Sequence, residues 1–221
     1  MRRRWYMLLA LLSATVGVSV WWRYAARRRE LPCPAWLAWM LENPYIETFT
    51  SSRQVLDYLD LRPGMRVLDV GAGPGRLTIP AAERVGPLGE VVALDVQAAM
   101  LDKLRARAAA RNLRNIRTVE RPIGAGALEP QMFDRAWMAL VLGEIPSQGE
   151  ALREIYAALK PGGILAITEM LPDPHYQTRA TVNRLAADAG FQIVEQFGTW
   201  TGFTMHLRKP ERATRNGDVT T

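Results

Sequence analysis

An α/β fold is the architecture that this sequence predicts: a seven-stranded, mostly parallel sheet with helices on both faces, preceded by a single transmembrane helix. Between residues 51 and 209, short apolar runs alternate with segments of helical periodicity. Such alternation is typical of strand–helix–strand units in a Rossmann-like sheet. An uncharged segment near the N-terminus predicts the membrane helix, and the 221 residues suffice for one such domain with an appendage.

The segment from Trp5 to Trp22 contains no charged residue. As a helix its 18 residues would be about 27 Å long, close to the roughly 30 Å hydrocarbon core of a bilayer. Aromatic pairs at both ends with flanking arginines are typical of a spanning helix. A cleaved signal peptide is one alternative, against which the bulky Trp21–Trp22 pair counts. An interfacial helix would need a polar face, which the segment lacks, so we expect residues 1–29 to be an anchor.

Residues 30–50 follow the anchor and contain Trp36 and Trp39. Two tryptophans just beyond a membrane segment indicate an interfacial helix that covers the domain. An ordinary N-terminal helix packed on the domain fits the same pattern. Tyr45 lies in this segment.

The positive charge is concentrated in the anchor region. The chain has 28 Lys and Arg against 22 Asp and Glu, a net charge of +6. Seven arginines lie in residues 1–29, where there is no acid, which leaves 21 bases against 22 acids in the remainder. This distribution favours a membrane surface as partner and argues against nucleic acid. The single cysteine, Cys33, excludes an internal disulfide and fits a reducing compartment.

The remaining elements follow from apolar runs, helical spacing and turn residues. Pro80 is expected to kink or shorten the helix after the first strand. Ser147 and Glu150 have the spacing of a capping box. The expected helices are 51–61, 74–85, 97–111, 147–159 and 177–189, the expected strands are 66–70, 90–95, 115–119, 134–140, 164–169, 191–197 and 203–208, and residues 210–221 are expected to be a disordered tail.

The most informative stretch is the loop at residues 67–76, VLDVGAGPGR. Its spacing is G-x-G-x-G, whereas a nicotinamide dinucleotide loop has G-x-G-x-x-G and binds a pyrophosphate. Asp69 would repel a pyrophosphate but attract an ammonium or a sulfonium group, and S-adenosylmethionine (SAM) carries both. Asp95 ends the next strand twenty residues beyond Gly75, where a carboxylate can bind the hydroxyls of a ribose.

These motifs resemble those of the class I SAM-dependent methyltransferases. VLDVGAGPG and VVALD resemble that superfamily's first two motifs, and FDRA at 133–136 and LKPGGIL at 159–165 resemble its fourth strand and the turn before its fifth. The resemblance extends over roughly residues 51–207 and is nearest to the quinone-biosynthesis and bacterial phospholipid N-methyltransferase branch. It implies SAM as cofactor, bound through Asp69, Gly71, Ala72, Gly73, Asp95, Val96, Glu120 and Leu140. The chain departs from the pattern after strand three, where Pro122 stands in place of the adenine-binding acid, and either Glu120 or the backbone is expected to supply that contact.

Methyl transfer requires the nucleophile and the methyl group to be held in line, and a base only if the acceptor is protonated. By position, the candidates for that base are Glu144, Glu169, Asp173, His175 and Tyr45, among which Glu144, His175 and Tyr45 come first. Glu144 is equally suited to stabilise the helix that begins after Ser147. Two histidines and one cysteine, widely separated, predict no metal site.

A membrane-anchored methyltransferase acting on a lipid-phase acceptor is the resulting hypothesis. A tether raises the effective concentration of an acceptor confined to the bilayer, so a phospholipid amine is expected first, and a quinone, isoprenoid or other small hydrophobic molecule is the alternative. A nicotinamide oxidoreductase and a non-catalytic SAM-binding module are the alternatives of other classes. Because SAM is cytoplasmic, the catalytic domain is expected in the cytoplasm. The sequence makes no prediction of oligomeric state.

Overall fold

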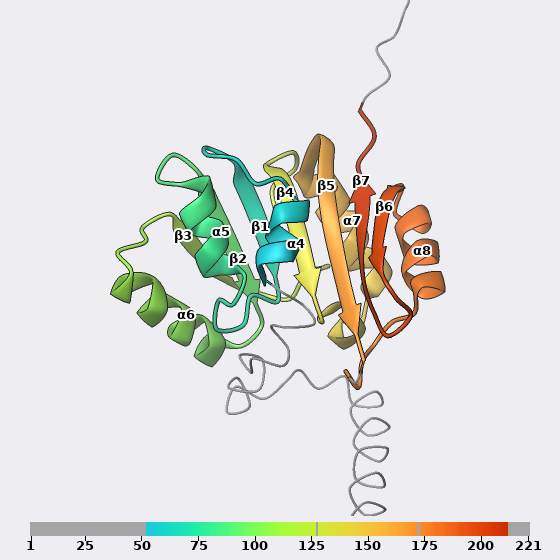
Figure 1. The fold of residues 1–221 in the computed structure, drawn as a ribbon, viewed down its shortest axis with the longest axis horizontal. Coiled ribbons are helices and arrows are strands. Elements are labelled where there is room, and N and C mark those ends of the chain that lie inside the picture. The colour runs from blue at the N-terminus through green and yellow to red at the C-terminus, as the bar shows by residue number, and fades with distance from the viewer. Residues whose placement is uncertain (1–51, 127, 172, 212–221) are drawn as a thin grey trace, which may run out of the picture.

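The computed structural model describes residues 52–126, 128–171 and 173–211. They form one seven-stranded sheet of order β3-β2-β1-β4-β5-β7-β6 (Figure 1). Six of the strands run in one direction. Strand β7 runs in the opposite direction, antiparallel to its neighbours β5 and β6. The mostly parallel sheet predicted from the sequence is confirmed, with strands β1 (Arg66–Val70), β2 (Glu90–Asp95), β3 (Ile116–Glu120), β4 (Phe133–Ala139), β5 (Leu159–Met170), β6 (Gln192–Gly198) and β7 (Gly202–Arg208).

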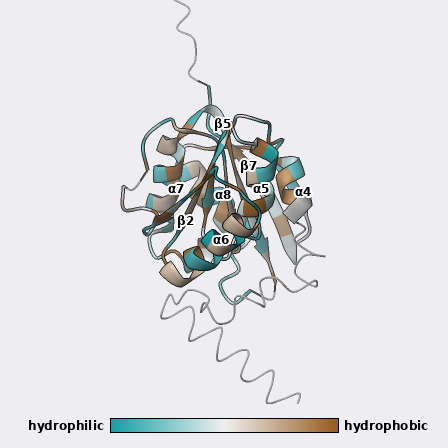
Figure 2. Cartoon of the chain, turned by 90° about the vertical axis from the view of Figure 1, so that its left-hand side faces the viewer, coloured by the Kyte–Doolittle hydropathy of each residue, from teal (hydrophilic) through white to brown (hydrophobic). Residues whose placement is uncertain are grey.

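The centre of the sheet is buried on both faces, which explains its continuous apolar runs. In the register, Asp69 of β1 lies between Ala93 of β2 and Trp137 of β4. Ala93 and Trp137 are fully buried. The hydrophobic residues, brown in Figure 2, gather on the strands and on the helix faces that meet them.

Helices cover both faces of the sheet, as the sequence predicts. On one face, α4 (Ser52–Tyr58) and α5 (Thr78–Val85) pack on Val67, Val91 and Trp137, and α6 (Ala98–Ala110) packs beside them against Ala93. On the other face, α7 (Gln148–Ala158) and α8 (Arg179–Asp188) pack on the larger core cluster of β1, β4, β5 and β7. Figure 1 shows α4 and α5 in front of the sheet and α7 behind it.

Three local predictions were wrong. Helix α5 begins at Thr78 rather than near residue 74, so the expected start was wrong, whereas the shortened first part is one of the two outcomes expected from Pro80. Pro80 lies in the first turn, where a missing N–H is tolerated. The capping box does not form, because the Ser147 side chain makes no capping hydrogen bond. Strand β5 begins at Leu159, because that residue pairs with Phe133 of β4. Main-chain hydrogen bonds join Gly162 and Gly163 to Lys209, so the segment expected to be a turn before this strand is part of the strand itself.

The predicted anchor (1–29), the predicted cover helix with Tyr45 (30–50) and all but the first two residues of the predicted tail lie outside the described residues. Among the residues that the structure describes, no helix is long and apolar enough to cross a membrane.

Candidate cofactor and active site

The glycine loop joins β1 to α5 with three glycines in the left-handed backbone region: Gly71 (φ +72°), Gly73 (φ +51°) and Gly75 (φ +93°). A Cβ on Gly71 would lie 2.4 Å from Cγ2 of Val141, and one on Gly75 would lie 2.4 Å from Cδ1 of Leu104. A Cβ on Gly73 would meet no atom within 4 Å. The first and third glycines therefore permit close packing, whereas the second borders open space in which a ligand can lie.

The backbone amides of this loop are already occupied. The amides of Gly71 and Ala72 both donate to the carbonyl of Leu94, at 2.8 and 3.1 Å. The amide of Gly73 donates to Oδ2 of Asp95 (2.8 Å), and that of Gly75 donates to the Ala72 carbonyl (3.1 Å). A pyrophosphate needs free amides at such a turn, so this geometry argues against a nicotinamide dinucleotide.

Asp69 lines the pocket from inside rather than standing at its mouth. The residue is 3% exposed, and its Oδ2 accepts a 2.6 Å hydrogen bond from the Thr78 hydroxyl. Burial raises the pKa of this carboxyl to about 7, the Thr78 bond opposes the shift and nearby Asp95 adds to it. A cation placed beside Asp69 would favour the charged carboxylate, so the site suits the cationic methionine end of SAM.

Asp95 holds the loop in shape. Its Oδ2 accepts from the Gly73 amide and its Oδ1 accepts from the Gln97 amide at 2.9 Å. Each carboxylate oxygen has a second lone pair, which leaves capacity for a ribose hydroxyl. The next residue, Val96, is 50% exposed, an apolar surface next to the acid.

The pocket over the loop combines the glycine turn with the end of β4. Leu140 lies in the left-handed region at φ +61°, a conformation that is costly for a non-glycine residue and is concentrated at functional sites. Its amide donates to the Thr168 carbonyl at 2.9 Å, which fixes the end of β4 to β5. The lining comprises Asp69, Gly71, Ala72, Gly73, Pro74, Arg76, Leu77, Ala139 and Leu140.

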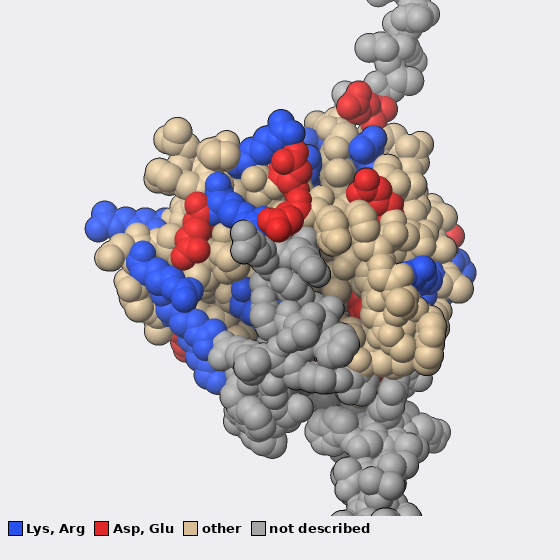
Figure 3. Space-filling model, viewed as in Figure 1, with Lys and Arg blue, Asp and Glu red and all other residues tan. Residues whose placement is uncertain are grey.

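Of the predicted cofactor residues, Asp69, Gly71, Ala72, Gly73 and Leu140 line this pocket and the others do not. Asp95 and Glu120 are register partners at the ends of β2 and β3, and Glu120 is exposed. The sequence interpretation missed four lining residues: Pro74, Arg76 and Leu77, which belong to the glycine loop or follow it, and Ala139 at the end of β4. Arg107 braces the loop by donating to the Pro74 carbonyl at 3.1 Å. In Figure 3 basic side chains form a band along the side of the molecule where α6 lies.

The ends of β4 and β5 bring the predicted catalytic residues together. Glu144 ends a 3₁₀ turn, η2 (Leu142–Glu144), and its Oε1 lies 3.8 Å from Nδ1 of His175. A Cβ on Gly143 would lie 1.9 Å from the His175 carbonyl oxygen, so only glycine permits this contact. The third predicted residue, Tyr45, lies outside the described residues.

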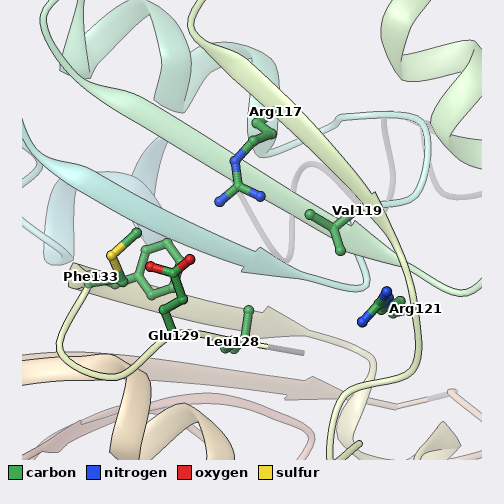
Figure 4. Close-up of a pocket in the computed structure, with 7 residues that line it drawn as sticks. Arg117, Val119, Arg121, Leu128, Glu129 and Phe133 are labelled. Atoms are coloured by element: carbon green, nitrogen blue, oxygen red, sulfur yellow. The ribbon is translucent and has the colours of Figure 1, made fainter. Parts of the chain in front are cut away.

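A larger hollow of about 270 Å³ lies elsewhere, between β3 and the segment before β4. Figure 4 shows Arg117 and Val119 on β3 and Arg121 just after its end on one side of it, and Leu128 and Glu129 on the other. The described residues of 121–132 form no helix, and Leu128 and Met132 of this segment pack against the core beside Val119 of β3. None of the glycine-loop residues lines this hollow, and we assign it no ligand.

This chain has a pocket over a glycine loop, at the carboxyl edge of a sheet with the strand order β3-β2-β1-β4-β5-β7-β6. Fold and site together identify its class as the SAM-dependent methyltransferases. The chain belongs to the family described as "Methyltransferase domain", which it matches over residues 61–201.

Curated relatives agree with this class. The chain is 34% identical over 150 residues to a ubiquinone/menaquinone biosynthesis C-methyltransferase, UbiE, of Idiomarina loihiensis, covering 66% of this chain and 57% of the relative. It is 36% identical over 127 residues to a nocamycin O-methyltransferase of Saccharothrix syringae, covering 56% and 44%. The chain thus spans about half the length of the curated relatives that it matches.

Among solved structures, a SAM-dependent methyltransferase from Aquifex aeolicus has the same fold, with a TM-score of 0.74 and 24% identity. The match covers 80% of this chain and 99% of that chain.

Proposed function

We propose that this chain transfers the methyl group of SAM to a small hydrophobic acceptor with a hydroxylated ring, of the kind from which quinones are made. The observation that carries the proposal is the 34% identity to a quinone-biosynthesis C-methyltransferase over 150 residues. This reverses the order expected from the sequence, in which a phospholipid amine came first.

The geometry supports the division of work that this reaction needs. The pocket over the glycine loop offers a buried acid, Asp69, for the cationic end of SAM. Asp95, which does not line the pocket but bonds to the Gly73 amide beside it, is the acid proposed for the ribose. Glu144 lies in the turn that follows β4, and His175 lies in the loop that follows β5. Both residues are close to the pocket over the glycine loop. Methyl transfer depends on holding the nucleophile in line with the methyl carbon, and two adjoining sites at one sheet edge provide for that alignment.

A bilayer location is part of the proposal. Quinones with isoprenoid tails are confined to the membrane, and the anchor predicted for residues 1–29 would raise the effective concentration of such an acceptor. The domain would then lie on the cytoplasmic side, where SAM is available. A phospholipid amine remains the second candidate, because the same tether would serve it equally.

The test is product analysis with the purified full chain and methyl-labelled SAM. Two acceptors are offered in the same vesicles: a demethylated quinol and phosphatidylethanolamine. The proposal expects label on a ring carbon or ring oxygen of the quinol. Label only on the phospholipid amine would move the second candidate to first place, and label on neither, with SAM bound, would support the non-catalytic SAM-binding module.

A nicotinamide enzyme is tested separately by calorimetry. The occupied loop amides lead us to expect SAM and its demethylated product to bind, and NADH and NADPH not to bind. Binding of a nicotinamide dinucleotide without any response to SAM would contradict the proposed function at its first step.

A further inference from the structure

The buried end of β5 carries a carboxyl group with an unused oxygen. Glu169 is 1% exposed, and its Oε2 accepts a 2.9 Å hydrogen bond from the Gln177 amide. Its Oε1 has no hydrogen-bond partner within the described part of the chain. A buried acceptor without a partner is unfavourable and calls for a functional explanation.

A second unsatisfied group lies on the same loop. His175 is 5% exposed, and neither ring nitrogen has a hydrogen-bond partner among the described residues. Its position is nevertheless fixed, because its amide donates to Oδ1 of Asp173 (2.6 Å) and its carbonyl accepts from Nε2 of Gln177 (2.8 Å). Gln177 thus holds both Glu169 and His175, through its amide and its side chain.

This cluster adjoins the cofactor loop. Val141 packs against Gly71, the turn η2 follows it directly, and the end of that turn packs against His175. The Leu140 amide and the Thr168 carbonyl tie the same two strands together one residue before Glu169. The two buried groups are therefore held beside the place where a methyl acceptor must approach SAM.

Other charged groups face Glu169 from the elements packed around it. They are Glu144 on η2, and Asp173, His175 and Tyr176 on the loop, with Arg179 on α8 beside Tyr176. Burial raises the pKa of Glu169 to about 8, the Gln177 bond opposes the shift, and the charges of Asp173 and Glu144 add to it. A base with its pKa near the working pH is best suited to proton transfer.

We propose that Glu169 takes the proton from the acceptor's hydroxyl group, through its free Oε1, with His175 and Glu144 positioning the acceptor and stabilising the charge that develops. The proposal rests on the proposed function. The ring hydroxyl gives its proton to the Glu169 carboxylate, and the ring carbon forms a bond to the methyl carbon while the methyl–sulfur bond breaks. The bonding electrons stay on sulfur, giving a neutral thioether; the ring C–H proton leaves to solvent and Glu169 returns its proton to the ring oxygen.

The opposite edge of the sheet provides a matched control. Glu195 on β6 lies 3.3 Å, Oε2 to Nδ1, from His206, another buried histidine. The pair lies on β6 and β7, and neither residue lines the pocket over the glycine loop. Glu195→Gln therefore changes a carboxyl beside a histidine without touching the proposed site.

The experiment compares wild type, Glu169→Gln and Glu195→Gln as full chains, with labelled SAM and two ring acceptors. One is a dihydroxybenzene, and the other is a nitro-substituted analogue whose hydroxyl is already ionised at pH 7. For Glu169→Gln we expect turnover of the first acceptor to fall by about 10²- to 10⁴-fold, turnover of the second to fall far less, and the rise in rate near pH 8 to disappear. SAM affinity should stay unchanged, which shows that the variant is folded, and Glu195→Gln should behave as wild type.

Equal losses on both acceptors, or an unchanged pH profile in Glu169→Gln, would overturn the role of Glu169. If wild type methylates neither ring, the proposed function fails instead. In that case infrared titration tests whether the Glu169 carboxyl group binds and releases a proton. A protonated-carboxyl band that vanishes near pH 8 in wild type and is missing in Glu169→Gln supports it, and no such band overturns it.

Discussion

The two ends of the site differ in how completely their polar groups are satisfied. At the glycine loop, the amides of Gly71 and Gly73 and both oxygens of Asp95 already have protein partners. At the ends of β4 and β5, one oxygen of Glu169 and both nitrogens of His175 lack hydrogen-bond partners among the described residues. The fold thus satisfies the polar groups of the cofactor end by itself, whereas the proposed acceptor end has buried polar atoms that an acceptor could contact.

The largest expected effect is on stability, and it involves both ends. The pKa of Asp69 is raised to about 7 and that of Glu169 to about 8, against about 3.9 and 4.3 in an unfolded chain. Between about pH 4 and pH 8 the folded state keeps protons that the unfolded state has lost, so stability should fall as pH rises, by several kcal/mol in total.

Chemical denaturation at a series of pH values measures this loss. Asp69→Asn and Glu169→Gln should each weaken the dependence of the free energy of unfolding on pH. Saturating SAM should remove only the part of this dependence that comes from Asp69. A stability that rises over this range would contradict the assignment of both buried acids.

The next effect belongs to the cofactor end alone. Gly73→Ala would place a Cβ in the open space over the loop, so we expect SAM affinity to fall about 10- to 100-fold, or about 1.4–2.7 kcal/mol. Gly64→Ala is the matched control, because Gly64 also has a positive φ (+85°) and nothing within 4 Å of an added Cβ. Both variants place a side chain at a positive φ, which is strained for a residue with a Cβ. Calorimetry should therefore show weaker SAM binding in Gly73→Ala only. Equal SAM affinities in the two variants would contradict a SAM position above Gly73.

A smaller effect is expected at the acceptor end. Glu144→Gln removes the negative charge 3.8 Å from His175, and we expect kcat to fall about tenfold, or about 1.4 kcal/mol, with SAM affinity unchanged. Initial rates with a saturating acceptor measure this effect. A change in SAM affinity without a change in kcat would place Glu144 at the cofactor end instead.

The smallest effect is a proton count. If the cationic end of SAM lies beside Asp69, binding at pH 7 should release about half a proton, since the free carboxyl is about half protonated there. Affinity should accordingly rise as pH increases from 6 to 8. Calorimetry in two buffers with different ionisation enthalpies gives the number of protons released when SAM binds. Proton uptake would contradict a position of the cationic end of SAM beside Asp69.

The sequence predicted the cofactor end better than the acceptor end for a physical reason. The glycine loop is local, and strands β1 and β2 are buried apolar runs whose ends are marked by a charged residue or a turn. Glu169 and His175 meet Glu144 only through the pairing of β4 with β5, which no local pattern encodes. An acid close to the end of an apolar run marks Asp69, Asp95 and Glu169 alike, and that shared position is the signal in the sequence on which the proposal for Glu169 could have been based.

Local geometry accounts for the remaining differences. The start of α5 depended on where the loop's own hydrogen bonds end, with the Ile79 amide bonded to the Gly75 carbonyl. The early start of β5 depended on pairing with Phe133, a residue 26 positions away. Neither pairing is visible in helical or strand periodicity.

The most direct test of the two-ended site is one SAM titration on three forms of the full chain: wild type, Asp95→Ala and Glu169→Gln. Wild type and Glu169→Gln should bind SAM with equal affinity. Asp95→Ala should bind about 10- to 150-fold more weakly, as for loss of a charged hydrogen-bonding group worth about 1.5–3 kcal/mol. Equal weakening in both variants would show that the cofactor and acceptor ends are not separate, and absence of SAM binding by wild type would contradict the account as a whole.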